Sequence, residues 1–199
     1  MIEGRAKTLS SDEFTKLVKI TSVERHGLRN IAILYCSFAL GLRVGEIAAL
    51  TVGDVMNDDG TIKDQFQIMR VNSKNRRNRE VFLTNTKVRK ALKAYLDDRR
   101  QNCDIAMVST SPLFRSQKGG AFTGHSLQMA MKTMFRKANL PETVSSHSGR
   151  RSFATNLLNQ QHVNIRTVQQ LLGHANISQT SVYCDADPMT MRNVVARVI

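Results

Sequence analysis

Tyr183 lies nine residues after His174, and a second cluster containing His147 and Arg150 precedes them in the chain. A phenol ionises near pKa ~10, so a tyrosine attacks phosphorus at neutral pH only when cations and a proton acceptor surround it. Histidine titrates close to neutrality, and arginine stays charged while its planar fork binds two phosphate oxygens. These residue types indicate phosphodiester chemistry with Tyr183 as the nucleophile.

Breaking a phosphodiester without a metal also requires positive charge on the non-bridging oxygens and a proton donor for the leaving oxygen. Arg43 and Arg150 are the candidates for the charge. His147 or His174 can accept the phenolic proton or donate a hydrogen bond to the phosphate. Lys74, in a basic stretch of the chain, can reach the leaving 5′ oxygen as an acid. We therefore expect neither a metal nor any other cofactor.

The elements that carry these residues follow from hydrophobic spacing and from caps. Ser10 and Glu13 form a capping-box pattern, and Gly41 begins a tight turn that holds Arg43 between two helices. Helical spacing predicts helices over about 11–22, 28–41, 44–50, 86–100, 123–138, 149–160, 164–172 and 188–197. Strands are predicted over 66–71 and 79–83, joined by the polar run 72–78 into a basic hairpin. The expected fold class is mainly α with a small antiparallel β-sheet (α+β).

The charge balance points to a polyanionic partner. The 199 residues include 29 Lys and Arg against 16 Asp and Glu, a net charge of +13. Such an excess concentrates polyanions at the surface, which favours double-stranded DNA over a basic surface without a specific role. An anionic membrane is set aside because no segment is long and apolar enough to insert.

Length and cysteine usage limit the organisation. A chain of 199 residues suits one domain, expected over 6–199, and residues 1–5 contain Ile-Glu-Gly-Arg. That tetrapeptide is often engineered as a protease site, so 1–5 is either such a remnant or a chance match in a naturally short chain. Three widely spaced cysteines argue against a disulfide framework and indicate a reducing compartment, here the cytoplasm.

Four strings in this chain, taken together, resemble the tyrosine recombinase (phage integrase) family. They are Gly-Leu-Arg-Val-Gly-Glu-Ile at 41–47, Ser-Lys-Asn at 73–75, His-Ser-Gly-Arg at 147–150 and Leu-Leu-Gly-His through Tyr183 at 171–183. Each string alone is weak, but all the key positions are present in the family's order. The resemblance implies a catalytic domain that cleaves and rejoins DNA through a 3′-phosphotyrosyl intermediate, without metal or ATP.

The resemblance also assigns roles to individual residues. Arg43 and Arg150 would clamp the phosphate, His174 would donate a hydrogen bond to it, and Lys74 would protonate the leaving oxygen. His147 would accept the proton of the Tyr183 hydroxyl. Glu46, which follows the first arginine, would hold Arg43 in place.

Other basic residues are expected to contact DNA phosphates, although a solvated basic surface is the alternative. They are Arg76, Arg77, Arg79, Lys118, Lys132 and Arg136. The helix predicted over 123–138 could enter a major groove, and phosphate contact is equally compatible with its sequence. Sequence readout therefore stays unassigned.

Three functions compete at this point. The first is a site-specific recombinase or integrase that acts as a tetramer on DNA and is a monomer when free. The second is a type IB topoisomerase that relaxes one duplex, and the third is a DNA-binding regulator without turnover. The combined catalytic set favours the recombinase. The DNA site, the outcome of recombination and the presence of a separate N-terminal DNA-clamping domain stay open.

Overall fold

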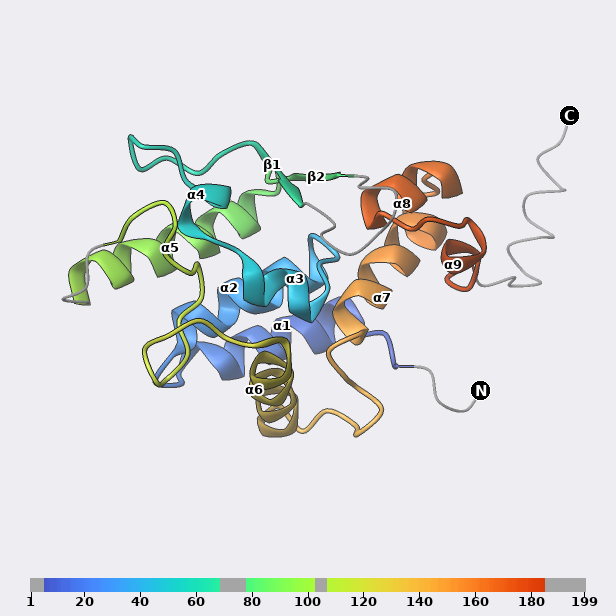
Figure 1. The fold of residues 1–199 in the computed structure, drawn as a ribbon. Coiled ribbons are helices and arrows are strands. Elements are labelled where there is room, and N and C mark those ends of the chain that lie inside the picture. Colours follow the sequence, from blue (N-terminus) through green and yellow to red (C-terminus); the bar gives the residue numbers. More distant parts are fainter. Residues whose placement is uncertain (1–5, 69–77, 103–106, 185–199) are drawn as a thin grey trace, which may run out of the picture.

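A computed structural model describes residues 6–68, 78–102 and 107–184. In these ranges the chain is mostly helical, with one small sheet (Figure 1). The helices are α1 (Ser11–Ser22), α2 (Gly27–Phe38), α3 (Val44–Ala49), α4 (Val52–Val55), α5 (Thr86–Asn102), α6 (Gly124–Lys137), α7 (Ser148–Thr155), the π-helix η1 (Asn156–Gln160), α8 (Ile165–Leu172) and α9 (Ser178–Ser181). The strands are β1 (Gln65–Ile68) and β2 (Arg79–Phe82). The predicted fold class is confirmed.

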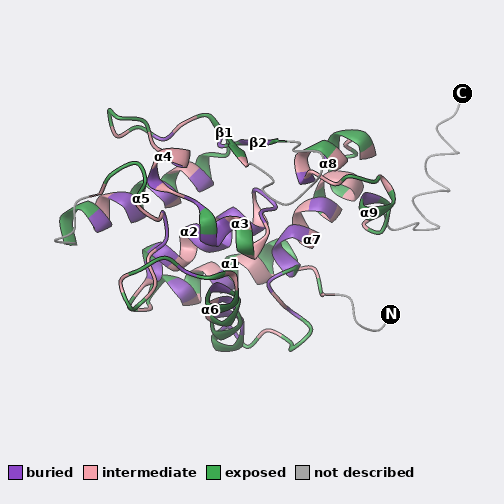
Figure 2. Cartoon of the chain, in the orientation of Figure 1, coloured by how far each residue is buried: buried purple, intermediate pink, exposed green. Residues whose placement is uncertain are grey.

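The larger hydrophobic core forms around α2, which packs against α1, α5 and α7. Helix α6 packs on α3 and α1 and keeps its other side in solvent (Figure 2). Its buried residues Leu127, Met131, Met134 and Phe135 recur at helical spacing, which explains why one face turns inward. None of the described helices is long and apolar enough to cross a membrane.

Capping hydrogen bonds mark the starts of α1 and α6. Ser10 Oγ accepts the backbone N–H of Glu13 at 3.2 Å, and Glu13 Oε2 accepts the backbone N–H of Ser10 at 2.9 Å. Thr123 caps α6 by accepting the backbone N–H of Ser126 at 3.0 Å. Each cap satisfies N–H groups that lack a partner inside the helix. The helix predicted over 11–22 is confirmed residue for residue.

The sheet is a two-stranded antiparallel ladder in which Gln65 pairs with Phe82 and Ile68 with Arg79. Strand β2 therefore ends one residue before the end of the predicted strand 79–83. Strand β1 begins one residue before the start of the predicted strand 66–71. The remainder of that predicted strand, together with Lys74, Arg76 and Arg77, lies outside the described residues. The helix predicted over 188–197 also lies outside them.

Two predictions on helices were incomplete. The helix predicted over 149–160 begins at Ser148 and continues from α7 into η1, where Gln161 N–H donates to Asn156 O at 3.0 Å. This i to i−5 bond widens the last turn, a change that hydrophobic spacing does not reveal. The short helices α4 and α9 were missed because four residues are too few to show a period.

Helix α7 lies very close to α2. A Cβ added at Gly149 would stand 2.1 Å from Ser37 Oγ, so only glycine fits at this crossing. Beyond the crossing, α7, η1, α8 and α9 enclose a second, smaller hydrophobic core at one end of the molecule (Figure 1). Its buried members are Ala154, Val168 and Leu172, and Tyr183 packs against them.

Candidate active site

Arg43 stands at the start of α3, in extended conformation, and Glu46 completes its cap. Glu46 Oε2 accepts the backbone N–H of Arg43 at 2.8 Å, and Oε1 accepts Arg43 Nη1 at 2.8 Å. The Arg43 side chain keeps 35% of its surface exposed. Glu46 thus makes the contact expected of it, and the Arg43 guanidinium lies at the surface of the site.

Arg79, at the start of β2, reaches the same carboxylate. Its Nη2 donates to Glu46 Oε2 at 2.7 Å, and its Nη1 donates to Leu171 O at 2.7 Å. Only 5% of its side chain is exposed. The expectation that Arg79 contacts DNA from the surface is therefore not met, because both terminal nitrogens bond within the protein.

Arg150 lies on α7 and is buried. Its Nη1 donates to Gly41 O at 2.8 Å, and its Nη2 donates to Leu172 O at 2.6 Å. Gly41 has φ +62°, and a Cβ there would stand 2.5 Å from Phe153 Cδ1. Glycine is thus required at the turn that presents its carbonyl to Arg150. These bonds hold the guanidinium between α3 and the end of α8.

The charges of these groups act on one another. Burial lowers the pKa of Arg150, and the charges of Arg43 and Arg79 lower it further, while Glu46 and Tyr183 oppose the shift. Burial raises the pKa of Glu46, but the Arg79 charge, the Arg43 backbone N–H and the Arg43 and Arg150 charges together bring it below its ordinary value. Three guanidiniums thus surround one carboxylate. The surplus of positive charge favours a bound anion.

His174 follows the left-handed cap of α8 at Gly173, which has φ +63°. Its ring is stacked on the Tyr183 ring, with centroids 6.1 Å apart and planes inclined by 21°. His174 Nδ1 is 2.9 Å from Thr180 Oγ1, and Thr180 is fully buried. This contact fixes one ring nitrogen of His174 inside the protein.

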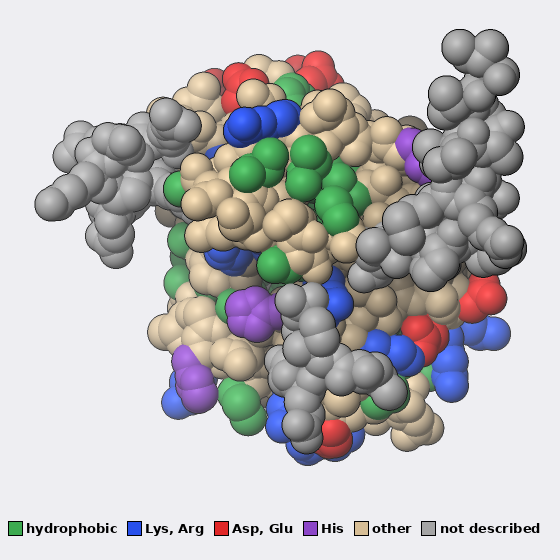
Figure 3. Space-filling model, turned by 90° about the vertical axis from the view of Figure 1, so that its right-hand side faces the viewer, with side chains coloured by type: hydrophobic (Ala, Val, Ile, Leu, Met, Phe, Trp, Pro, Cys, Tyr) green, Lys and Arg blue, Asp and Glu red, His purple; other side chains and the backbone are tan. Residues whose placement is uncertain are grey.

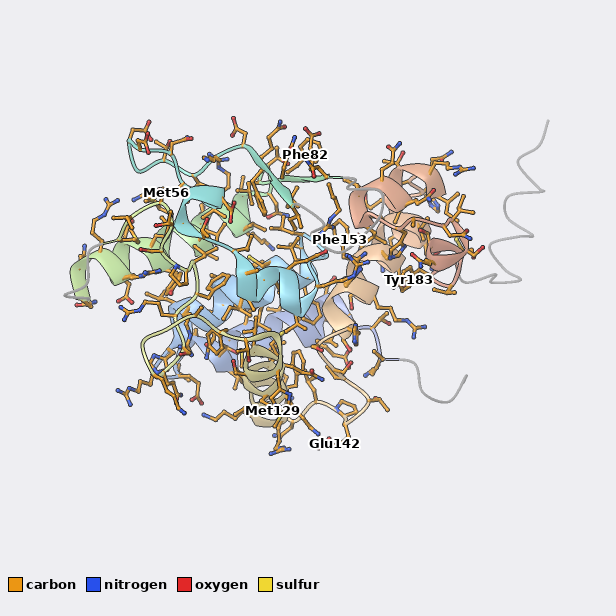
Figure 4. The ribbon with its side chains drawn as sticks, in the orientation of Figure 1. Met56, Phe82, Met129, Glu142, Phe153 and Tyr183 are labelled. Carbon is orange, nitrogen blue, oxygen red and sulfur yellow. The ribbon has the colours of Figure 1, made fainter. Side chains whose placement is uncertain are left out.

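His147 is the N-cap residue of α7, three positions before Arg150, and is exposed. Residues three apart lie near each other on a helix, so His147 is on the same side of α7 as Arg150. Tyr183 and Phe153 come from the α7–α9 end of the molecule (Figure 4). The structure thus brings Arg43, Glu46 and Arg150 together and places His174 beside Tyr183.

Three of the basic residues expected to contact DNA lie at the protein surface. Lys118, Lys132 and Arg136 are exposed, and Lys132 Nζ lies 3.6 Å from Glu142 Oε2. The face seen in Figure 3 carries histidine and Lys or Arg side chains next to a hydrophobic patch. A groove of about 840 Å³ runs between β2 and α8 and reaches His174.

The sequence did not reveal two residues that contact the site residues within the protein. Thr180 carries no motif, and only its spacing of six residues from His174 across a loop hints at a contact. Arg79 stood among several neighbouring cations, and nothing in the sequence separates a buried arginine from exposed ones. Among the described residues, no group of three or more His, Cys, Asp or Glu is placed to hold a metal ion.

The fold is that of a tyrosine recombinase catalytic domain. The phage integrase family matches residues 7–189, and the chain belongs to that family.

Individual relatives agree with the family. Tyrosine recombinase XerC of Bacillus subtilis (strain 168) is 31% identical over 192 residues, which cover 94% of this chain and 59% of XerC. Tyrosine recombinase XerD of Chlamydia trachomatis serovar D is 33% identical over 180 residues, covering 88% of this chain and 56% of XerD. The chain thus spans less than two thirds of the length of these relatives.

Solved structures give the same fold. The crystal structure of XerA recombinase superposes with a TM-score of 0.76 at 26% identity, covering 97% of this chain and 65% of XerA. XerH recombinase bound to its difH substrate superposes with a TM-score of 0.70 at 23% identity, covering 99% of this chain and 56% of XerH.

Proposed function

We propose that this chain is the catalytic part of a site-specific DNA recombinase or integrase. It cleaves and rejoins DNA strands through a 3′-phosphotyrosyl intermediate, without metal or ATP. The observation that carries the proposal is the cation cluster around Glu46. Arg43 and Arg150 are held there with surplus positive charge, and Tyr183 is near enough to influence the pKa of Arg150.

The proposed reaction runs as a transesterification. The Tyr183 oxygen attacks the phosphorus in line, the bond to the 5′ oxygen breaks, and the phosphate remains joined to tyrosine. Arg43 and Arg150 stabilise the charge that develops on the non-bridging oxygens. His174 hydrogen-bonds the phosphate, His147 accepts the phenolic proton, and the 5′ oxygen receives a proton from Lys74. Reversal by a second strand's 5′ hydroxyl completes strand exchange.

The partners are part of the same proposal. XerH recombinase is bound to its difH substrate in its crystal structure, which supports double-stranded DNA with a specific site as the substrate here. Lys118, Lys132 and Arg136 are exposed, so they are available for phosphate contacts, and Arg76 and Arg77 join them in the proposal. We place the protein in the cytoplasm, monomeric when free and tetrameric on DNA, with 6–199 as one catalytic domain.

The test is trapping on nicked suicide duplexes, which lose the strand segment needed for religation. A pool of duplexes with randomised arms is incubated with the protein, with and without chelator, and separated under denaturing conditions. We expect a covalent protein–DNA band that chelator does not change and that Tyr183→Phe abolishes while DNA binding persists. Tight binding without any band would instead support a non-catalytic regulator.

A second assay separates strand exchange from relaxation. Plasmids carrying two copies of the trapped site are expected to give recombinant products. Relaxation of supercoiled plasmid without such products, and without dependence on the site, would support the type IB topoisomerase alternative.

A further inference from the structure

We propose that Arg79 is a positioning residue that fixes two parts of the active site relative to each other. Its guanidinium joins Glu46, which holds Arg43, to the end of α8, which leads into His174. The proposal rests on the proposed function, because it assigns Arg79 a role in that same reaction. Arg79 itself does not touch the phosphate.

The first half of the link is the shared carboxylate. Glu46 Oε2 accepts Arg79 Nη2 at 2.7 Å and the Arg43 backbone N–H at 2.8 Å, while Oε1 is left for Arg43 Nη1 at 2.8 Å. A carboxylate with one oxygen occupied by Arg79 cannot rotate freely. Oε1 is therefore held in one orientation for Arg43 Nη1, and this contact fixes the direction of the exposed Arg43 guanidinium.

The second half is the contact with α8. Arg79 Nη1 donates to Leu171 O at 2.7 Å, one of the last carbonyls of the helix, where a cation is favourable. A Cβ at Gly173 would stand 2.8 Å from Arg79 Cδ, so the arginine stem fills the space beside the residue that precedes His174. The direction in which the chain leaves α8 thus depends on Arg79.

Arg150 makes a parallel contact with the next carbonyl, Leu172 O, at 2.6 Å. Two buried guanidiniums from different elements therefore hold successive carbonyls at the end of α8. Both terminal nitrogens of Arg150 bond to neutral carbonyls, so its charge remains available to the phosphate in the proposed reaction, whereas the charge of Arg79 is paired with Glu46. The difference separates a residue that contacts the substrate from one that acts through its neighbours.

Buried ion pairs contribute little net stability compared with apolar pairs of similar size, but a single partner left behind is costly. Because of this asymmetry, a loss of catalytic positioning can be distinguished from a loss of folding stability. Arg79→Met alone removes the buried partner of Glu46 and leaves the carboxylate only with Arg43, whereas Arg79→Met with Glu46→Gln removes both charges of the buried pair. We expect the double variant to recover thermal stability and to remain slow in cleavage.

The experiment measures single-turnover cleavage of a nicked suicide duplex at saturating DNA, together with thermal unfolding, for the full chain. A displacement of about 1 Å in a catalytic group costs roughly 100-fold in rate. We expect Arg79→Met and the double variant to lose at least about 10-fold in rate, with DNA affinity nearly unchanged. Arg79→Lys keeps one charged contact, so its cleavage rate should lie between the rates of these two variants and the rate of the wild type.

Arg99→Met is the matched control. Arg99 is 7% exposed and likewise donates to backbone carbonyls, those of Pro112 and Leu113, but lies on α5. It should lower stability without slowing cleavage. Wild-type cleavage by the double variant would overturn the proposal, and so would an equal loss in Arg99→Met.

A second readout does not depend on activity. In isotope-labelled protein, the imidazole signals of His174 and the side-chain signals of Arg43 are expected to shift in Arg79→Lys and in the double variant, but not in Arg99→Met. Unchanged signals would overturn the positioning role even if the protein cleaved no DNA. Failure of the wild type to form a covalent complex would instead count against the proposed function alone.

Discussion

The ring of His174 lies on the ring of Tyr183 within one chain, with their centroids 6.1 Å apart. His174 follows α8, which supplies Val168 and Leu172 to the smaller hydrophobic core, and Tyr183 follows α9 and packs against that core. Tyr183 also influences the pKa of Arg150, so the two side chains lie near each other within this chain.

Cleavage is therefore expected to occur in cis. Mixing Tyr183→Phe protein with Arg150→Ala protein on a suicide duplex should give no covalent band, since neither protomer has both groups. Each variant mixed with wild-type protein is the control for assembly. Restored cleavage in the mixture of the two variants would show that the tyrosine is supplied by a neighbouring protomer.

Thr180 is expected to tune His174. Thr180→Val removes the partner of Nδ1 while keeping nearly the same volume, and the loss of one hydrogen bond of about 1 kcal/mol corresponds to roughly fivefold in cleavage rate. Thr180→Ser restores the hydroxyl and should restore most of the rate. The measurement is single-turnover cleavage at saturating DNA. Equal rates for the valine variant and the wild type would show that this contact does not matter for catalysis.

Glu46 should give stability a specific pH dependence. Its pKa in the folded protein lies below the ordinary value of 4.5, since the charges of Arg79 and Arg43 outweigh burial. Its contribution is then complete above that ordinary value and is lost as pH falls through the lower folded pKa. The difference in unfolding free energy between wild type and Glu46→Gln is expected to be largest near neutrality and to shrink in acid.

Denaturant unfolding at a series of pH values checks this expectation. Glu142→Gln serves as the control, because that side chain is 76% exposed and its ion pair with Lys132 is long, at 3.6 Å. A difference for Glu46→Gln that stays constant down to strongly acidic pH would contradict the assigned charge state.

Two glycines four residues apart should respond in opposite directions to alanine. Gly41 has φ +62° and Phe153 in the way, so Gly41→Ala is expected to cost at least about 1–2 kcal/mol of stability. Gly45 lies in α3 with nothing within 4 Å of an added Cβ, so Gly45→Ala should stabilise by about 0.5–1 kcal/mol. Chemical denaturation of both variants measures the contrast.

Helix α6 is expected to contribute to the salt dependence of DNA binding. If Lys132 and Arg136 each contact a phosphate, substitution by alanine should reduce the slope of log affinity against log salt by about 0.9 per residue. Lys93→Ala is the control, because Lys93 is exposed on α5 and pairs with Asp97. Unchanged slopes for the α6 variants would assign these residues to a solvated surface.

Much of the fold follows from local signals in the sequence. The Ser10 cap and the hydrophobic spacing after it suffice to define α1, and the glycine turn at 41 separates α2 from α3. What sequence could not supply were features set by tertiary contact. The widened turn of η1 depends on the packing of α7 and α8, and Gly149 is required because Ser37 approaches from another helix.

The same distinction applies to the site. Arg43, Arg150, His174 and Tyr183 could be selected because their types and order suit phosphoryl chemistry. Arg79 could not be separated from its cationic neighbours, because its role depends on a carboxylate 33 positions away and a carbonyl 92 positions away. A buried arginine bonds to groups within the protein, whereas an exposed arginine can bind DNA. The sequence alone does not show which of several arginines is buried.

The division of the interior into two cores bears on the covalent state. Tyr183 packs at the margin of the smaller core, built on Ala154, Val168 and Leu172, while α2 and its neighbours form the larger one. A DNA strand tethered to Tyr183 would pull first on the smaller unit. Arg79 and Arg150, which donate to Leu171 O and Leu172 O at the end of α8, would pass part of that tension to the larger core, so a load on the tethered strand is expected to reach Arg43 through Glu46.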